Sequence, residues 1–264
     1  MRLGFGWLAV IVICMSPVAA QAALFSFDSP AEVVLSPTQA PNVWYTDRYP
    51  PAIFASGQNG GGRTGVLQQN INAEDFDRDP PFDSAFYNTQ GRKYDLAPGT
   101  QGLVIELYVP SSWDALNQID GRLASFWATG FSDANIVTDF FPIIEFNTSR
   151  PGLGDNGFRV WDSNTGWFNV GGFSGFNQWY QLGFVLEGGQ ERFFVNGSLI
   201  GSVNDPLTTQ LGNVILQGYN SGNSYNISWD NLSVVPEPAT LPAFALLLAG
   251  IGCGALRRRK QRRS

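Results

Sequence analysis

The feature that most constrains the fold is a series of short apolar segments divided by clusters of Gly, Asn, Asp and Pro. No convincing helical stretch lies between them, and a strand signal about every 10–15 residues predicts an all-β sandwich or barrel. The predicted strands are Leu103–Val109, Arg122–Thr129, Phe140–Asn147, Phe158–Asp162, Trp167–Val170, Trp179–Glu187, Arg192–Val195, Ser198–Val203, Val214–Tyr219 and Tyr225–Val235.

Two of these segments are specific enough to be interpreted residue by residue. Asn196-Gly197 lies between two strand-like runs and predicts a tight hairpin, since both turn positions need positive φ. Along 179–187, the side chains of Tyr180, Leu182, Phe184 and Leu186 are expected on one face.

By contrast, residues 40–100 hold Pro-Pro and Gly-Gly-Gly runs and few clear strand signals, and Val66–Asn70 is one candidate strand. We expect this irregular part to pack over a face of the same domain, because its many aromatics need burial.

The first 22 residues are typical of a secretory signal peptide. Arg2 precedes the apolar run Trp7–Met15, which is too short for a bilayer of roughly 30 Å, and Ala20-Gln21-Ala22 fits a cleavage site. The alternative is a buried N-terminal helix. The exported body, residues 23–235, would then contain neither cysteine, because Cys14 and Cys253 lie in the two ends. It therefore has to fold without a disulfide.

The C-terminal end, residues 236–264, has three parts in order. Pro236-Glu237-Pro238 is followed by an apolar stretch, 239–256, long enough to form a single transmembrane helix. A basic tail, 257–263, should stay on the cytoplasmic side; its charges are Arg257, Arg258, Arg259, Lys260, Arg262 and Arg263. This order resembles the PEP-CTERM sorting signal of Gram-negative bacteria. The resemblance implies recognition by an exosortase, anchoring by the C-terminus before processing, and then a place at the cell surface or in the extracellular matrix. A plain tail anchor is the alternative.

Composition excludes several kinds of function. The chain has no histidine, so a Ser-His-Asp triad, a Cys-His pair and histidine-ligated zinc are excluded. Residues 23–235 hold nine basic and 21 acidic residues, a net charge of −12 that disfavours binding to nucleic acid.

The last third of the body resembles a known fold. Its order, W-Y-x-L-x-F from Trp179, R-F-F-V-N-G-x-L-I-G from Arg192 and W-D-N-L-S-V from Trp229, is similar to concanavalin A-like lectin/glucanase domains, including laminin-G-like modules. The resemblance implies a two-sheet antiparallel jelly-roll sandwich. Since this fold has many functions, it says less about activity.

Candidate sites follow from residue chemistry. Asp75, Asp77 and Asp79 alternate as in a calcium loop, but Pro80 and Phe86 break the EF-hand pattern, so Ca²⁺ in another geometry and a solvated acidic loop are both open. The Glu-x-Asp-x-x-Glu signature of glycosidases on this fold is absent: Glu106 and Glu145 lack a second acid two or four residues away, and Glu187 and Glu191 only flank a Gly-Gly turn. We therefore expect no enzymatic activity.

Glycan binding needs aromatic platforms and polar groups. The candidates are Trp161, Asp162, Asn164, Trp167, Asn220 and Asn223. The alternative is that the two tryptophans belong to the core and the Asn and Gly positions are only turns. The sequence thus predicts an exported, non-catalytic protein that binds a polysaccharide or builds an exopolysaccharide layer. The alternatives are a carbohydrate-active enzyme on the same sandwich and a protein-binding adhesion module.

Overall fold

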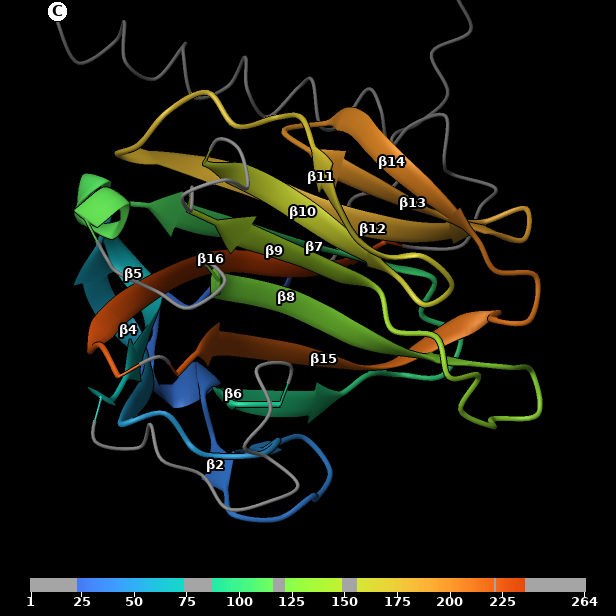
Figure 1. The fold of residues 1–264 in the computed structure, drawn as a ribbon. Coiled ribbons are helices and arrows are strands. Elements are labelled where there is room, and N and C mark those ends of the chain that lie inside the picture. The colour runs from blue at the N-terminus through green and yellow to red at the C-terminus, as the bar shows by residue number, and fades with distance from the viewer. Residues whose placement is uncertain (1–22, 74–86, 116–121, 149–155, 221, 236–264) are drawn as a thin grey trace, which may run out of the picture.

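The computed structural model describes residues 23–73, 87–115, 122–148, 156–220 and 222–235. Two β-sheets stack face to face in this part of the chain (Figure 1). The predicted signal peptide, the sorting signal and the acidic residues Asp75, Asp77 and Asp79 lie outside the described residues. Among those that are described, no helix has the length and apolar character needed to cross a membrane.

Sheet A consists, in spatial order, of β14 (Ser198–Asn204), β13 (Gln190–Val195), β12 (Gln178–Glu187), β7 (Gly102–Val109), β16 (Tyr225–Val235), β5 (Arg63–Ile71) and β4 (Ile53–Gly60), and β1 (Ala23–Phe25) also pairs with β16. Sheet B consists of β11 (Gly166–Val170), β10 (Gly157–Asp162), β9 (Ile143–Asn147), β8 (Arg122–Phe131), β15 (Gln210–Tyr219), β6 (Thr89–Asp95), β3 (Trp44–Thr46) and β2 (Leu35–Ser36). Two short 3-10 helices, η1 (Pro30–Glu32) and η3 (Ser111–Ala115), lie in connections.

The pairing is antiparallel throughout the two sheets, apart from the short edge pair β2–β3. Each sheet is built around strands that are far apart in sequence: β16 lies between β7 and β5, and β15 lies between β8 and β6. The prediction of a two-sheet antiparallel jelly-roll sandwich is therefore confirmed.

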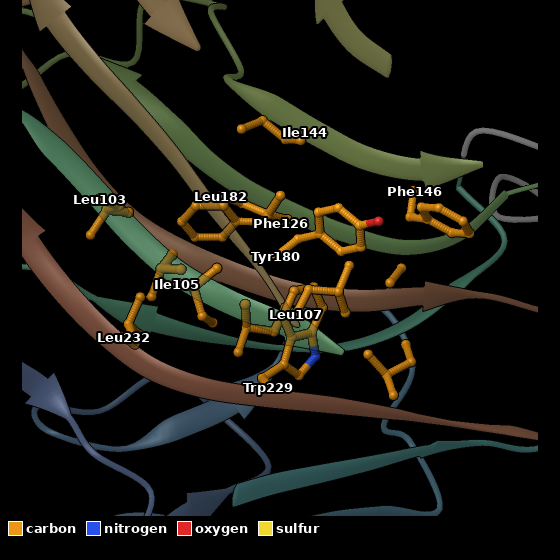
Figure 2. Packing of buried hydrophobic residues seen from close by; sticks show 14 of the residues in the cluster. Leu103, Ile105, Leu107, Phe126, Ile144, Phe146, Tyr180, Leu182, Trp229 and Leu232 are labelled. Carbon is orange, nitrogen blue, oxygen red and sulfur yellow. The ribbon is translucent and has the colours of Figure 1, made fainter. Parts of the chain in front are cut away.

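The core lies between the two sheets and follows from the alternation of side chains along the strands. Tyr180, Leu182 and Phe184 of β12 are fully buried, as predicted, and Leu186 nearly so. They face Phe126, Ile144 and Phe146 from sheet B (Figure 2). The rings of Phe126 and Phe184 stack with their centroids 4.5 Å apart, which ties the centre of one sheet to the centre of the other.

The predicted Asn-Gly hairpin is also present. It joins β13 to β14, and Asn196 and Gly197 have φ values of 50° and 78°. These positive angles at both positions explain the residue choice, since glycine adopts them without strain and asparagine tolerates them.

The prediction of an irregular segment at 40–100 is wrong, because this region contributes β3, β4, β5 and β6. The glycine run is the turn of the β4–β5 hairpin, where Gly61 and Gly62 have positive φ. The alternation in β5 is hidden in the sequence because buried Gln69 occupies an inner position. Its amide donates to the Gln90 carbonyl at 2.9 Å and accepts from Trp229 Nε1 at 3.0 Å. The expected burial of aromatics does occur, since Trp44 and Phe54 belong to the main core.

The stacked contact at the centre of the core gives a stability prediction. Replacing Phe184 with Ala should lower the free energy of unfolding by about 3–5 kcal/mol, through lost apolar burial and the cavity that remains. Urea denaturation followed by tryptophan fluorescence measures this change. Leu199→Ala on the adjacent hairpin is the control: Leu199 is 58% exposed, and its truncation should cost less than about 0.5 kcal/mol. Similar losses for the two variants would contradict the described core.

Candidate functional site

The predicted residues Trp161 and Trp167 form a directly opposed cross-strand pair in the β10–β11 hairpin. They lie on the outer face of sheet B, with ring centroids 5.3 Å apart in an edge-to-face arrangement. Both are partly buried, and they pack on an apolar base made by Trp127, Ile143 and Ile215. The structure thus brings these two aromatic candidates together, on the outer face rather than in the core between the sheets.

A polar row runs across the strands beside this aromatic row. Arg159 lies opposite Glu145, and Glu145 lies opposite Ser125. The Arg159 guanidinium donates to Glu145 Oε1 through Nε at 3.0 Å and Nη2 at 2.6 Å, and Ser125 Oγ donates to Oε2 at 2.7 Å. Glu145 is fully buried, and the Arg159 guanidinium supplies the counter-charge beside it.

An arginine lies against each row: Arg159 against the tryptophan pair, and Arg48 against Gln217, which lies opposite Ser125 in the polar row. Arg159 lies over the Trp167 ring, with its Cζ 4.3 Å from the centroid. Farther along the sheet, Arg48 Nη1 donates to Gln217 Oε1 at 3.1 Å and pairs with Asp47 at 2.8 Å. The loop that carries Arg48 is joined to β6 by a backbone hydrogen bond, in which Gly91 N donates to Tyr49 O at 2.9 Å; a Cβ on Gly91 would come within 2.5 Å of Gln217 Cβ of β15. The two arginines hold the Trp167 ring and the Gln217 amide in fixed positions.

The remaining predicted glycan-binding residues do not join the tryptophan pair in one site. Asp162 caps the β10–β11 turn, accepting from Asn164 N at 2.8 Å and from Thr165 Oγ1 at 2.7 Å. Burial raises the pKa of Asp162, but these hydrogen bonds lower it by more. Asn164 is exposed in the same turn. Asn220 is buried at the far end of β15, and Asn223 follows it; from the strand register, they lie roughly 20 Å from Trp161.

A second cluster, which the sequence did not reveal, lies on the outer face of sheet A. Glu106 of β7 and Asp230 of β16 are directly opposite each other. Arg63 Nη1 contacts both, at 2.5 Å from Glu106 Oε2 and 2.6 Å from Asp230 Oδ2, and Asn231 Nδ2 donates to Glu106 Oε2 at 2.7 Å. Two carboxylates therefore share one guanidinium nitrogen.

This arrangement shifts the proton affinity of the groups. Burial raises the pKa of Asp230 to about 6, because the loss of water outweighs the opposing effect of Arg63. Burial lowers the pKa of Arg63, but Glu106 and Asp230 raise it by more, so the arginine stays charged. Asp230 is thus a carboxyl group that titrates near neutral pH, which is a property of many functional sites.

A cavity of about 370 Å³ lies on the same face, one side-chain row farther along β7 and β16 than the carboxylate pair, and neither acid lines it. Tyr108 and Ser228, which pair across β7 and β16 in the row next to Glu106 and Asp230, line it together with Gln68 and Asn226. The β4–β5 turn closes one side: Gly61 lies against the Tyr108 ring and accepts from Trp179 Nε1 at 3.0 Å. Hydroxyl, amide and aromatic groups therefore converge beside two acids.

From the sequence, only acids in the same strand as Glu106 were considered, whereas the acid beside it, Asp230, lies in β16. The strand partner of Glu106 is in β16, and no local sequence signal predicts that pairing. For metals, no group of three or more His, Cys, Asp and Glu side chains that could hold an ion occurs in the part of the chain that the structure describes.

Comparisons with known proteins concern the fold. No family model matches the chain, and no curated protein matches it. Several solved structures are similar. The catalytic domain of an endo-1,3-β-glucanase (laminarinase) from Thermotoga petrophila is 11% identical, covers 83% of this chain and 99% of that one, and has a TM-score of 0.48. A β-glucanase from Bacillus licheniformis is 11% identical, with coverages of 74% and 92% and a TM-score of 0.41. A tetrameric galectin from the ball sponge Cinachyrella is 14% identical, with coverages of 55% and 98% and a TM-score of 0.39.

These comparisons contradict the prediction that the chain is not an enzyme, because several of the similar structures are glycoside hydrolases. The prediction is withdrawn. An identity of 11–12% limits the likeness to the fold, so it transfers neither substrate nor catalytic residues. Hydrolytic activity in this chain has to be argued from its own carboxylates.

The raised pKa of Asp230 predicts a pH-dependent stability. A proton bound more tightly in the folded than in the unfolded state stabilises the fold at low pH, and this stabilisation is lost as pH rises from about 4 to about 6. Over that range the wild type should lose about 2–3 kcal/mol of unfolding free energy relative to Asp230→Asn. Urea denaturation at several pH values measures the difference. Asp162→Asn is the control. Because the pKa of Asp162 is lowered, the wild type should gain unfolding free energy relative to this variant as pH rises, and only below about pH 4. A pH-independent difference for Asp230→Asn would contradict the prediction.

Proposed function

We propose that the protein is carbohydrate-active and binds a polysaccharide on the outer face of sheet B, at Trp161 and Trp167. The observation that carries this proposal is the cross-strand tryptophan pair beside the Arg159–Glu145 ion pair. Sugar rings bind to aromatic surfaces through their apolar C–H faces, and their hydroxyl groups need fixed polar partners close by. The tryptophan pair supplies the aromatic surface, and Arg159, whose side chain is 11% exposed and held in place by buried Glu145, supplies a fixed polar group beside it.

The charges of this face favour a neutral polysaccharide. Arg159 is neutralised by Glu145, and Arg48 by Asp47. The body as a whole carries a net charge of −12 over residues 23–235. An anionic polymer would meet repulsion at long range with few available cations at short range. We therefore expect binding that depends little on salt concentration.

Binding is tested on a glycan array, followed by calorimetric titration of the strongest oligosaccharide. Trp161→Ala and Trp167→Ala should each weaken binding about tenfold or more, as expected for a lost aromatic anchor, while the Trp→Phe variants retain most of it. Leu199→Ala, on the opposite sheet, should bind as the wild type. Unchanged affinity in both alanine variants would overturn the proposal. Capture of a protein partner that excess oligosaccharide does not displace would favour the adhesion function instead.

A second candidate function, glycoside hydrolysis, is favoured by the pair Glu106 and Asp230 beside the 370 Å³ cavity. Both carboxylate oxygens lie within 2.6 Å of one nitrogen, so they are no more than about 5 Å apart, which is below the roughly 6.5–9.5 Å between the acids of inverting glycosidases and favours a retaining mechanism. Protonated Asp230 would donate its proton to the leaving oxygen as the glycosidic bond breaks, and Glu106 would bond to the anomeric carbon. Water, deprotonated by Asp230, would then displace Glu106 and release the sugar. Arg63, whose side chain is 34% exposed, would have to turn away to admit the substrate.

Hydrolysis is tested by the release of reducing sugar at pH 5–6. Asp230→Asn and Glu106→Gln should each lower the rate by about 100-fold or more, because each removes one partner of the acid–nucleophile pair. Leu199→Ala, at an exposed position on the edge strand β14, is the control for general damage and should keep the wild-type turnover. A wild-type protein that binds a polysaccharide but releases no sugar from it would reject this second function and leave the first intact.

The sequence resemblance at 236–264 adds a cellular setting to this proposal. We propose export through the inner membrane, anchoring by the C-terminal segment, processing by an exosortase at Pro236-Glu237-Pro238, and a final place at the cell surface or in the extracellular matrix. Strand β16 ends at Val235, directly before this motif. A polysaccharide outside the cell would then be within reach of the sandwich.

A further inference from the structure

Glu191 is a carboxylate in a position that an apolar side chain would normally fill. It lies on the inner face of β13, opposite Leu186 of β12 and Val203 of β14. Its exposure is 0%, and neither Oε1 nor Oε2 has a hydrogen-bond partner in the described structure. A fully buried carboxyl group with two unsatisfied oxygens is costly, by several kcal/mol when it is ionised.

A second carboxyl group lies beside it. Asp205 follows β14 and is also buried, and its negative charge acts on Glu191. Asp205 Oδ1 accepts from the amides of Leu207 and Thr208, both at 3.2 Å, while Oδ2 has no partner in the described residues. The Asp205 amide donates to the Gly189 carbonyl at 2.9 Å, which ties this loop to the turn before Glu191. Three carboxylate oxygens are therefore buried together without donors.

The charges on neighbouring elements do not compensate for them. Arg192 is next to Glu191 in β13 but faces outward, where it forms an ion pair with Glu187. A further unsatisfied oxygen is present instead: Gln101 Oε1 is buried and without a partner in the described part of the chain. Gln101 precedes β7, and its carbonyl accepts from Leu186 N at 2.7 Å, so it lies across Leu186 from Glu191.

We propose that Glu191 and Asp205 bind a calcium ion at this end of the sandwich, with Gln101 Oε1 as a further oxygen ligand. Ca²⁺ is coordinated by carboxylate and amide oxygens in flexible geometry, whereas Mg²⁺ requires near-ideal octahedral geometry and retains water. The body offers no thiolate or imidazole for a softer metal. The ion would link the side chains of the β12–β13 turn, the loop after β14 and the start of β7, in addition to the backbone hydrogen bonds that join these segments. This site is separate from both surfaces of the proposed function.

The competing explanation is that a proton alone satisfies the pair. Burial raises the pKa of Glu191 well above its usual range, and the Asp205 charge raises it further, so a neutral Glu191 is a real alternative. The two explanations differ in one measurable respect: a bound cation stabilises the folded state in proportion to its concentration, and a proton-only pair is indifferent to calcium.

The experiment compares the melting temperature of the full-length chain, purified in mild detergent, in EDTA and in CaCl₂. We expect a rise of about 5–10 °C at a calcium concentration about 100 times Kd, together with saturable binding by calorimetry. Glu191→Gln, which keeps the shape and removes the charge, should abolish both effects, and Asp205→Asn should weaken them. Glu187→Gln, on the other side of the same turn, is the matched control and should respond like the wild type. An unchanged wild-type melting temperature in CaCl₂, or a calcium response retained in Glu191→Gln, would overturn the proposal.

Discussion

The packing of the inner face of sheet A against the inner face of sheet B determines the rest of the molecule. Phe126 stacks on Phe184 at the centre, and the inner side chains of both sheets join in one core cluster around that contact. A slip of one residue would turn every inner side chain outward, so the core also fixes which residues face solvent. Glu106 and Tyr108 lie on the outer surface because Leu107, between them, is fully buried in the core. Both candidate surfaces are therefore consequences of the core.

The two outer faces use the same residue types with different results. On sheet B, Glu145 has its own arginine, Arg159, and a hydroxyl donor, Ser125, so it orients its neighbours. On sheet A, Glu106 and Asp230 share Arg63, and one cation cannot fully offset two partly buried anions. The shared pair keeps one group that titrates near pH 6. Chemistry that moves a proton therefore suits sheet A, and recognition without proton transfer suits sheet B.

Local contacts were predictable from the sequence, and long-range ones were not. The Trp161–Trp167 pair is readable because both residues lie in one short hairpin, and the Asn196-Gly197 turn carries its own backbone signal. Arg63 and Asp230 are 167 residues apart, and only the pairing of β16 with β7 and β5 brings them together. In β5, the buried amide of Gln69 obscured the apolar alternation. The strands after residue 100 thus follow from local pattern, those at 40–100 do not, and a site assembled across strands requires the topology.

Gln69 and Glu191 show how a polar side chain on an inner face can be interpreted. The Gln69 amide is satisfied within the protein, by a backbone carbonyl and the Trp229 indole, so its role in the core is structural. Glu191 occupies an equivalent inner position, yet the described residues give its carboxylate neither a donor nor a counter-charge. Burial of such a group is tolerated when a proton or a cation from solvent neutralises it. A second carboxylate with an unsatisfied oxygen beside it doubles the charge to be neutralised, which a divalent cation does more completely than a single proton.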